Sequence, residues 1–244
     1  IVRPQSIEKF IANSDIIINL VGVLHESGGE SYFDSHVTGI RNIAKLSIKY
    51  EVDELLHVSS IGADIDSDSK YQSTKGQGEK VLLEYFPKAK IVRPSIVFGP
   101  DDGFFSVQSK IVKLSPIVPM FGGGNNKFQP VYVKDLIDGI IRLLNSKDDQ
   151  GKIYEFGGPD VMTMKEVYEL ILKTLKIRRL LIPAPTVAAK LIATFAQLLP
   201  DPIITRDLVK ILKFDNVVNE KSNTLASLNI NPQSAKVIVP TYLK

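Results

Sequence analysis

The sequence contains no cysteine and no tryptophan, and only three histidines and three methionines. The lack of cysteine excludes disulfides and thiolate metal sites, and three scattered histidines argue against a metal centre. No uncharged run is long enough to cross a bilayer as a helix. The formal net charge is only +3, with no basic stripe interleaved with aromatic residues. We therefore expect no nucleic-acid partner.

The residues that are present predict an α/β protein. With 244 residues, 44% of them apolar, the chain can form one domain plus a modest appendage. The apolar run Ile16–Ile18 predicts a strand over 15–20, buried on both faces as in a parallel sheet. Further strands are predicted at 55–58, 91–94, 128–133 and 153–156. Helices are predicted at 5–12, 33–50, 71–85, 135–145 (capped by Asp135), 163–175, 185–199 and from Thr205, with loops and short turns over the last thirty residues.

The segment that follows the strand at 55–58 carries the most specific chemistry. A polar loop leads into a helix with Tyr71 and Lys75, which lie on one helix face because they are four residues apart. A nearby ammonium favours phenolate and predicts a lowering of the pKa of Tyr71 from about 10 toward about 7–8. Such a tyrosine could exchange a proton with an alcohol or ketone, with the Ser60 hydroxyl holding the substrate oxygen. The alternative is a chance motif on an ordinary surface helix.

Five motifs occur in an order and spacing that resemble the atypical, extended branch of the short-chain dehydrogenase/reductases. In sequence they are IIINLVG at 16–22, HVSS at 57–60, Tyr71…Lys75 with Gly78-Glu79, IVRPS at 91–95 with Phe98-Gly99, and QPVYV at 129–133 with Asp135. The chain is most similar to the NADPH-binding accessory subunits of respiratory complex I and their alphaproteobacterial relatives. The resemblance extends over essentially the whole chain.

The resemblance implies a set of site residues and two departures from the family pattern. The implied catalytic residues are Tyr71, Lys75 and Ser60. The implied cofactor-binding residues are Leu20, Val21, Gly22, Ser59, Tyr71, Lys75, Pro94, Ser95 and Val97. Ile61 stands where catalytically competent members usually have serine or threonine, which argues against catalysis without affecting cofactor contact. His36 stands where extended members usually have an asparagine that organises the active site.

The resemblance also implies a partial fold. The fold is expected to be a partial Rossmann-like parallel sheet that lacks the first strands, over residues 1–150. A small, mostly helical substrate-side or partner domain is expected over 151–244. In the family, the glycine-rich turn that holds the pyrophosphate precedes the strand at 15–20, and these 244 residues do not contain it. NADP(H) or NAD(H) is thus the implied cofactor, but we expect poor binding by this chain alone.

The expected partners and location follow from the same resemblance and from the most apolar predicted helix, at 185–199. That helix is either buried in a two-domain core or a surface for a partner or a bilayer interface. The implied partners are respiratory complex I subunits or a membrane surface. The implied location is cytoplasmic, or on the side equivalent to the mitochondrial matrix, peripheral to a membrane. Self-association is expected because the strand at 15–20 lacks its family neighbour.

Three functional hypotheses remain open from the sequence. The first is a non-catalytic complex I accessory subunit built on a dinucleotide-binding fold. The second is a working NAD(P)-dependent oxidoreductase or epimerase of the extended type, motivated by Tyr71 and Lys75. The third is a truncated product without activity, motivated by the absent glycine-rich turn.

Overall fold

The computed structural model describes residues 1–26, 29–196, 205–211 and 214–244. Its internal contacts divide the chain into two compact units. Unit 1 comprises Ile1–Arg93 and Gly139–Glu155, and unit 2 comprises Pro94–Asp138 and Phe156–Lys244. We describe each unit by itself. The domain boundary near residue 150 stays a prediction from the sequence.

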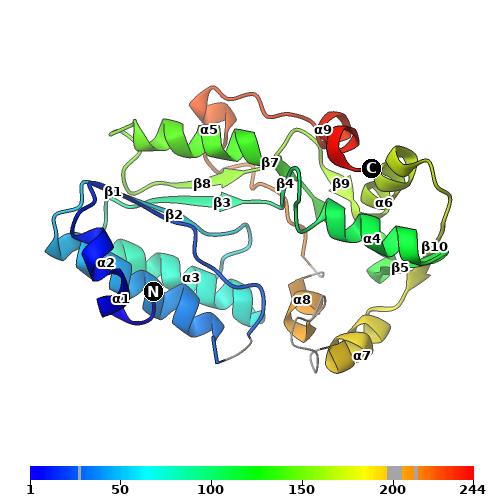
Figure 1. The fold of residues 1–244 in the computed structure, drawn as a ribbon, viewed down its shortest axis with the longest axis horizontal. Helices are drawn as coiled ribbons and strands as arrows, with labels where there is room; N and C mark the ends of the chain where they lie inside the picture. The colour runs from blue at the N-terminus through cyan, green and yellow to red at the C-terminus, as the bar shows by residue number, and fades with distance from the viewer. Residues whose placement is uncertain (27–28, 197–204, 212–213) are drawn as a thin grey trace. The chain divides into compact units, whose positions relative to one another are not determined.

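Unit 1 is built on a four-stranded sheet with the strand order β1-β2-β3-β8. The strands are β1 (Ile16–Asn19), β2 (Glu54–Val58), β3 (Lys90–Pro94) and β8 (Ile153–Phe156). The first three pair in parallel. Helices α1 (Pro4–Ile11), α2 (Gly39–Lys49) and α3 (Lys70–Tyr85) lie on one face, and the part of α5 (Val133–Leu144) that belongs to unit 1, from Gly139 onward, lies on the other (Figure 1). The predicted α/β class with a parallel sheet is confirmed.

The core of unit 1 forms where α2 and α3 pack their apolar sides on the sheet. Ile43 of α2, Leu82 of α3 and the strand residues Leu55 and Ile91 are all part of one buried cluster. Burying side chains of this size contributes about 1.5–3 kcal/mol each.

The prediction that the first strand is buried on both faces is wrong. Ile17 packs against the core, but the alternate side chains of Ile16 and Ile18 are 49% and 44% exposed. Among the described strands β1 pairs only with β2, so it forms an edge of the sheet. An apolar run shows that a strand forms, but it does not show which neighbours the strand has.

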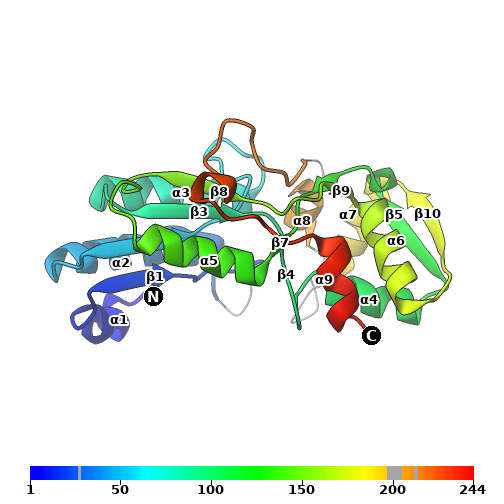
Figure 2. The ribbon, with the colours of Figure 1, turned by 90° about the horizontal axis from the view of Figure 1, so that it is seen from above.

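Unit 2 packs three helices around its own core. They are α4 (Phe105–Leu114), α6 (Met164–Leu175) and α9 (Ala235–Tyr242), which contribute Phe105, Ile171 and Val239 to one buried cluster. Strands β5 (Ile117–Phe121) and β10 (Leu180–Ala184) form a parallel pair beside α6 (Figure 2). The remaining described elements are β4 (Val97–Phe98), β7 (Val131–Tyr132), β6 (Lys127–Phe128), β9 (Met162–Thr163), η2 (Gly122–Gly124), α7 (Thr186–Ala196), α8 (Arg206–Ile211) and η3 (Ala226–Leu228).

Several predicted boundaries in unit 2 need correction. The strand expected at 128–133 is two short strands, β6 and β7, separated at Pro130, which has no amide to donate. Helix α5 begins at Val133, and Asp135 lies in its first turn, where its carboxylate accepts the Gln233 amide at 2.7 Å. The loop expected at the C-terminal end contains α9, because Ser234 caps a helix there. Residues 197–199 of the predicted apolar helix lie outside the described residues.

A buried ion pair joins the layers of unit 1. The fully buried Lys90 ammonium donates to Glu54 Oε2 at 2.8 Å and to the Leu143 carbonyl at 2.7 Å. The first bond links β3 to β2, and the second satisfies a carbonyl in the last turn of α5, where a cation is also favoured by the helix dipole. The position of α5 on the sheet therefore depends on one buried charge.

We expect Glu54→Ala to lower the free energy of unfolding by about 3 kcal/mol, because it leaves the Lys90 charge buried without its carboxylate. Lys90→Met should cost less, about 1–3 kcal/mol, and the double variant should cost less than the sum of the two. Urea denaturation measures all three. Lys152→Ala is the control, since its ion pair with Asp149 is half exposed and should change stability by less than about 1 kcal/mol. Additive effects of Glu54→Ala and Lys90→Met would contradict this account.

Candidate functional site

The first part of the site lies at the carboxyl ends of β1 and β2. Asn19 and His57 are register partners on these strands, and both are buried. Asn19 Oδ1 accepts the Val21 amide at 3.1 Å, so its Nδ2 donates to His57 Nδ1, also at 3.1 Å. His57 therefore carries its proton on Nε2, and that atom has no hydrogen-bond partner among the described residues. Burial, together with the charge of Lys75, lowers the pKa of His57 to about 3.

His36 joins the loop after β1 to helix α3. It lies in η1, the π-helical turn Asp34–Thr38 that leads into α2. Its Nε2 accepts the Val23 amide at 3.2 Å, so its Nδ1 carries the proton and donates to Thr74 Oγ1 at 2.9 Å. Burial, followed by the Lys75 charge, lowers the pKa of His36 to about 4. The imidazole is thus neutral at physiological pH, and both of its nitrogens are used.

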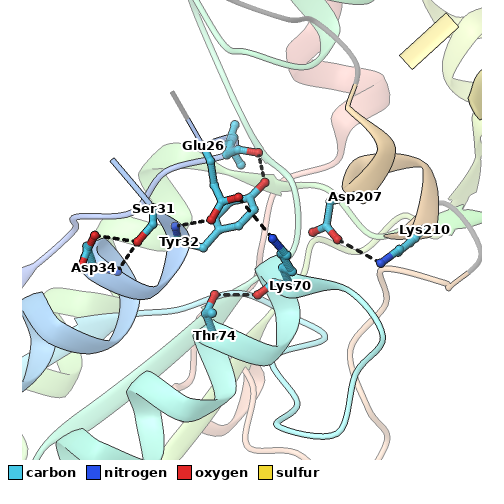
Figure 3. A network of polar contacts seen from close by, with 9 residues as sticks. Glu26, Ser31, Tyr32, Asp34, Lys70, Thr74, Asp207 and Lys210 are labelled. Atoms are coloured by element: carbon cyan, nitrogen blue, oxygen red, sulfur yellow. Dashed lines mark hydrogen bonds and ion pairs between the residues drawn. The ribbon is translucent and has the colours of Figure 1, made fainter. Parts of the chain in front are cut away.

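Three rings pack together beside this histidine. Tyr32 stacks on His36 with ring centroids 5.6 Å apart, and Tyr71 meets both rings edge-on. Figure 3 shows the polar contacts of Glu26 and Tyr32. Glu26 accepts the Tyr32 amide at 3.2 Å and pairs with Lys70 at the start of α3, 3.6 Å away. These contacts connect Tyr32 to the helix that carries Tyr71.

Two glycines allow the close approach of α3 to the rest of the site. A Cβ at Gly78 would lie 2.1 Å from the His36 carbonyl oxygen, so only glycine lets η1 and α3 pack this closely. A Cβ at Gly22 would lie 3.0 Å from Lys75 Nζ. The predicted role of Gly22 was to admit a ligand. In the structure it lies against the Lys75 ammonium.

The predicted lowering of the pKa of Tyr71 is wrong. Burial raises the pKa of its phenol, and the neighbouring Ser60 hydroxyl opposes the rise without reversing it. Burial also lowers the pKa of Lys75 to about 8, opposed by the charge of Glu79. The helical spacing places the two side chains on one face as expected, but it does not reveal how much each is desolvated. Tyr71 is protonated at neutral pH and is not poised as a base.

The strand end that carries the serines is buried and incompletely bonded. Ser59 Oγ and Ser60 Oγ are shielded from solvent without meeting hydrogen-bond geometry to any described residue, although Ser60 lies close enough to influence Tyr71. Ile61, at the position of the family hydroxyl, is buried and apolar. The Lys75 ammonium is nearly buried and is influenced by the charge of Glu79, whose carboxylate is bonded to Arg93. His57 Nε2 and Ser59 Oγ are thus buried polar atoms without a hydrogen-bond partner among the described residues, at the same strand ends.

The other predicted site residues occupy varied positions. Leu20 and Val21 follow β1 with exposed side chains. Pro94 is the last residue of β3, and Pro94, Ser95 and Val97 all belong to unit 2. There the Ser95 hydroxyl contacts Asn216 Oδ1 at 2.5 Å and its amide bonds to the Phe156 carbonyl. Ser95 therefore already has partners within its own unit.

Sequence reasoning missed Asn19, His57 and Tyr32 as parts of the site. Asn19 and His57 are polar residues inside apolar strand runs, and that interruption was the available signal. It also missed how α3 is anchored. The Glu79 carboxylate accepts hydrogen bonds from Arg93 Nε at 2.9 Å and from Arg93 Nη2 at 2.6 Å. This bidentate pair ties α3 to β3.

The described residues contain no cluster of His, Asp and Glu suited to a metal ion. The donor set instead suits a ligand with vicinal hydroxyls. The Lys75 ammonium and the hydroxyls of Ser59, Ser60 and Tyr71 are of the type that can bond to a ribose. These residue types therefore fit a nicotinamide ribose.

Relatives share this sequence over almost its full length. The chain is 33% identical over 232 residues to "NADH dehydrogenase [ubiquinone] 1 alpha subcomplex subunit 9, mitochondrial" of Dictyostelium discoideum, covering 93% of this chain and 64% of the relative. It is 30% identical to the "NADH-ubiquinone oxidoreductase 40 kDa subunit, mitochondrial" of Neurospora crassa, covering 99% of this chain and 64% of the relative. The chain thus spans less than two thirds of the length of these relatives.

Solved structures share the fold. A dTDP-4-dehydrorhamnose reductase from Bacillus anthracis in complex with NADP superposes with a TM-score of 0.70 at 16% identity, covering 99% of this chain and 84% of that one. The dTDP-glucose 4,6-dehydratase DesIV from Streptomyces venezuelae, with NAD bound, gives a TM-score of 0.66 at 19% identity, covering 75% of this chain and 65% of that one. The pattern of the NAD-dependent epimerase/dehydratase family matches residues 1–157. The chain belongs to that family.

Proposed function

We propose that this chain is a cofactor-binding but non-catalytic family member that serves the assembly or stability of a respiratory NADH dehydrogenase complex. The observation that carries the proposal is the combination of Ile61 at the hydroxyl position with a Tyr71 whose pKa is raised. The site offers hydrogen bonds to a cofactor ribose, and its tyrosine, which is protonated near neutral pH, is not poised as a base. The names of the relatives supply the type of complex.

The proposed cofactor is NADP(H) or NAD(H), held at its nicotinamide-ribose end. Lys75 would bond to the ribose together with Ser59, Ser60 and Tyr71. The carboxyl ends of strands β1 and β2 would lie beside the ribose. The cofactor supplies hydride chemistry in active family members, whereas here these residues bind and orient it. Neither Gly122–Gly124 nor Gly157-Gly158 has the spacing of a pyrophosphate-binding turn. We therefore expect this chain to hold the nicotinamide half alone, with a dissociation constant above millimolar for NADPH.

An active NAD(P)-dependent oxidoreductase or epimerase is the second candidate, favoured by Tyr71 and Lys75 on one face of α3. It requires Ser60 to replace the family hydroxyl and Tyr71 to lose its proton. Incubation with NADPH and a panel of 4-keto sugar nucleotides tests this candidate. Consumption of NADPH that Tyr71→Phe abolishes would favour the enzyme over the non-catalytic subunit.

The proposed partners are subunits of such a respiratory complex, and the proposed location is peripheral to a membrane on the matrix-like or cytoplasmic side. The names of the relatives place those proteins in mitochondria. No helix in the described parts of this chain has the length and apolar character to cross a membrane. Helix α7 exposes Val187 by 63% and Leu191 by 59%, while Ala189 and Ala193 are buried. This pattern favours the surface interpretation of α7 over a fully buried helix.

We expect Lys75→Ala to weaken binding of nicotinamide mononucleotide by roughly tenfold or more. The lost interaction is a charge-assisted bond to the ribose, worth about 1.5–3 kcal/mol. Ligand-observed NMR measures this weak affinity. The same measurement with 2′-phospho-AMP, the other half of NADPH, tests whether the chain holds the nicotinamide half alone. Lys80→Ala is the control, since Lys80 is exposed on the same helix. Equal affinities of Lys75→Ala and the unaltered chain would show that the site does not hold the ribose.

We expect stability to fall as the pH drops from about 6.5 toward 4, because His36 and His57 bind protons more readily in the unfolded chain. Each histidine contributes a slope of up to about 1.4 kcal/mol per pH unit in this range. His36→Asn should reduce the slope of unfolding free energy against pH by the contribution of one histidine. Urea denaturation at a series of pH values measures this slope. Thr74→Val is the control, which removes the hydrogen bond but keeps the imidazole. It should lower stability at neutral pH and retain most of the slope. An unchanged slope in His36→Asn contradicts the neutral assignment.

We propose that the isolated chain self-associates through β1, whose outer edge is unpaired among the described strands. Light scattering during size exclusion at tens of micromolar should detect oligomers. Ile18→Lys should shift the chain toward monomer, because a charge on an edge strand opposes strand pairing. Ile48→Lys, with a similar exposure of 49% but on α2, should not. A monomer peak for the unaltered chain, with cooperative melting, would refute the proposal.

A further inference from the structure

Unit 2 carries a surface in which exposed basic and aliphatic side chains are mixed. Residues 104–134 and 170–200 contain nine lysines and arginines and no aspartate or glutamate, although the net charge of the whole chain is only +3. In the structure, parts of these segments come together at the end of α4, along β5 and β10, and in the connector 176–179. We call this surface the basic–apolar patch.

Direct contacts make the patch continuous. Arg179 Nε donates to the Val112 carbonyl in the last turn of α4 at 2.7 Å. The Leu180 amide bonds to the Pro116 carbonyl at 3.0 Å, and Leu180 is the register partner of Ile117. The exposed Lys176 and Arg178 therefore lie in the chain segment that Arg179 fixes to the end of α4. The exposed Lys110 stands in the same helix, one turn before Leu114.

The apolar part of the patch is a strand face that the core does not use. Val118 and Met120 of β5 point into the core of unit 2. The alternate residues Ile117 and Pro119 are exposed, and so are their partners Leu180 and Ile182 on β10. Leu114, next to them at the end of α4, is 87% exposed. Aliphatic side chains this exposed are costly in water unless another apolar medium covers them.

We propose that the basic–apolar patch docks unit 2 on an anionic phospholipid surface. The lysines and arginines match phosphate headgroups, while Leu114, Leu180 and Ile117 enter the acyl boundary. A protein partner fits less well, because protein interfaces are enriched in aromatic residues and depleted of lysine, whereas the exposed apolar residues of the patch are aliphatic and lie beside lysines as well as Arg178. The absence of carboxylates over both segments also removes the groups that would repel an anionic surface.

The proposal deepens the peripheral membrane location proposed above and rests on unit 2 alone. It makes no use of Tyr71, Lys75 or the cofactor. A chain that binds vesicles but not nicotinamide mononucleotide would retain this inference and lose the proposed cofactor site. A chain that binds nicotinamide mononucleotide but not vesicles would retain the proposed cofactor site and lose this inference.

Cosedimentation of the 244-residue chain with vesicles tests the proposal. The vesicles are phosphatidylcholine alone, or phosphatidylcholine mixed with phosphatidylglycerol, at low and high salt. We expect binding only to the anionic vesicles, weakened by salt. The combined variant Lys110→Glu, Lys176→Glu and Arg178→Glu should lower the partition coefficient roughly a hundredfold. A matched triple variant, Lys80→Glu, Lys88→Glu and Lys147→Glu, changes the net charge equally at exposed sites of unit 1 and should bind within a few-fold of the unaltered chain.

A second pair of variants tests the apolar contribution at constant charge. Leu114→Ser with Leu180→Ser should weaken vesicle binding at least tenfold, whereas Ile48→Ser with Ile65→Ser should not. Circular dichroism and melting of each variant check that it folds. Equal losses in the two charge variants would mean that net charge alone drives binding, and would overturn the patch. The proposal would also be overturned if the unaltered chain sedimented no more with anionic vesicles than it does without vesicles. That result would favour an acidic protein as the partner.

Discussion

The burial of the Lys75 ammonium is the constraint that orders the rest of the site. The side chain is 5% exposed and has no carboxylate within hydrogen-bonding distance among the described residues, because the nearby Glu79 is held by Arg93. Burial lowers the pKa of His36 and of His57, and the Lys75 charge lowers both further, so both imidazoles are neutral at physiological pH. Their hydrogen-bond partners then fix one tautomer each: Val23 and Thr74 for His36, and Asn19 for His57. The buried cation and the two neutral imidazoles therefore form one electrostatically coupled group.

The same buried lysine bears on binding and on proton transfer at this site. A lysine that is short of acceptors gains from ligand hydroxyls, which is why we propose a ribose as its ligand. Lowering the pKa of Tyr71 would require the positive charge to outweigh the desolvation of a phenolate, and burial wins instead. Burial also lowers the pKa of Lys75 to about 8, so the group whose pKa lies nearer to neutral is the lysine and not the phenol.

The parts of this structure that depend on local pattern could be predicted from the sequence. The strands at β1, β2 and β3, the helix α3, and the common face of Tyr71 and Lys75 all follow from apolar runs and helical spacing. The pKa of Tyr71 could not be predicted, because it depends on how closely η1 approaches α3, and that approach is set by Gly78 against the His36 carbonyl. The exposure of Ile16 and Ile18 depends on which strands are present beside β1. The partners of Asp135 depend on a segment about a hundred residues away in sequence.

The charges of the two units differ in how far their electrostatic effect reaches, because one is buried and the others are exposed to solvent. In unit 1, a cation is buried, so its effect is confined to groups in contact with it, and salt changes it little. In unit 2, the cations are exposed and numerous, so each contributes weakly to folding, and together they produce a field that reaches about a Debye length into solvent. A field of that kind has no function inside the fold, since the core of unit 2 is formed by Phe105, Ile171 and Val239 without charged groups. Its effect is directed outward, toward an anionic surface, and the exposed leucines beside it give such a surface an apolar contact once it has approached.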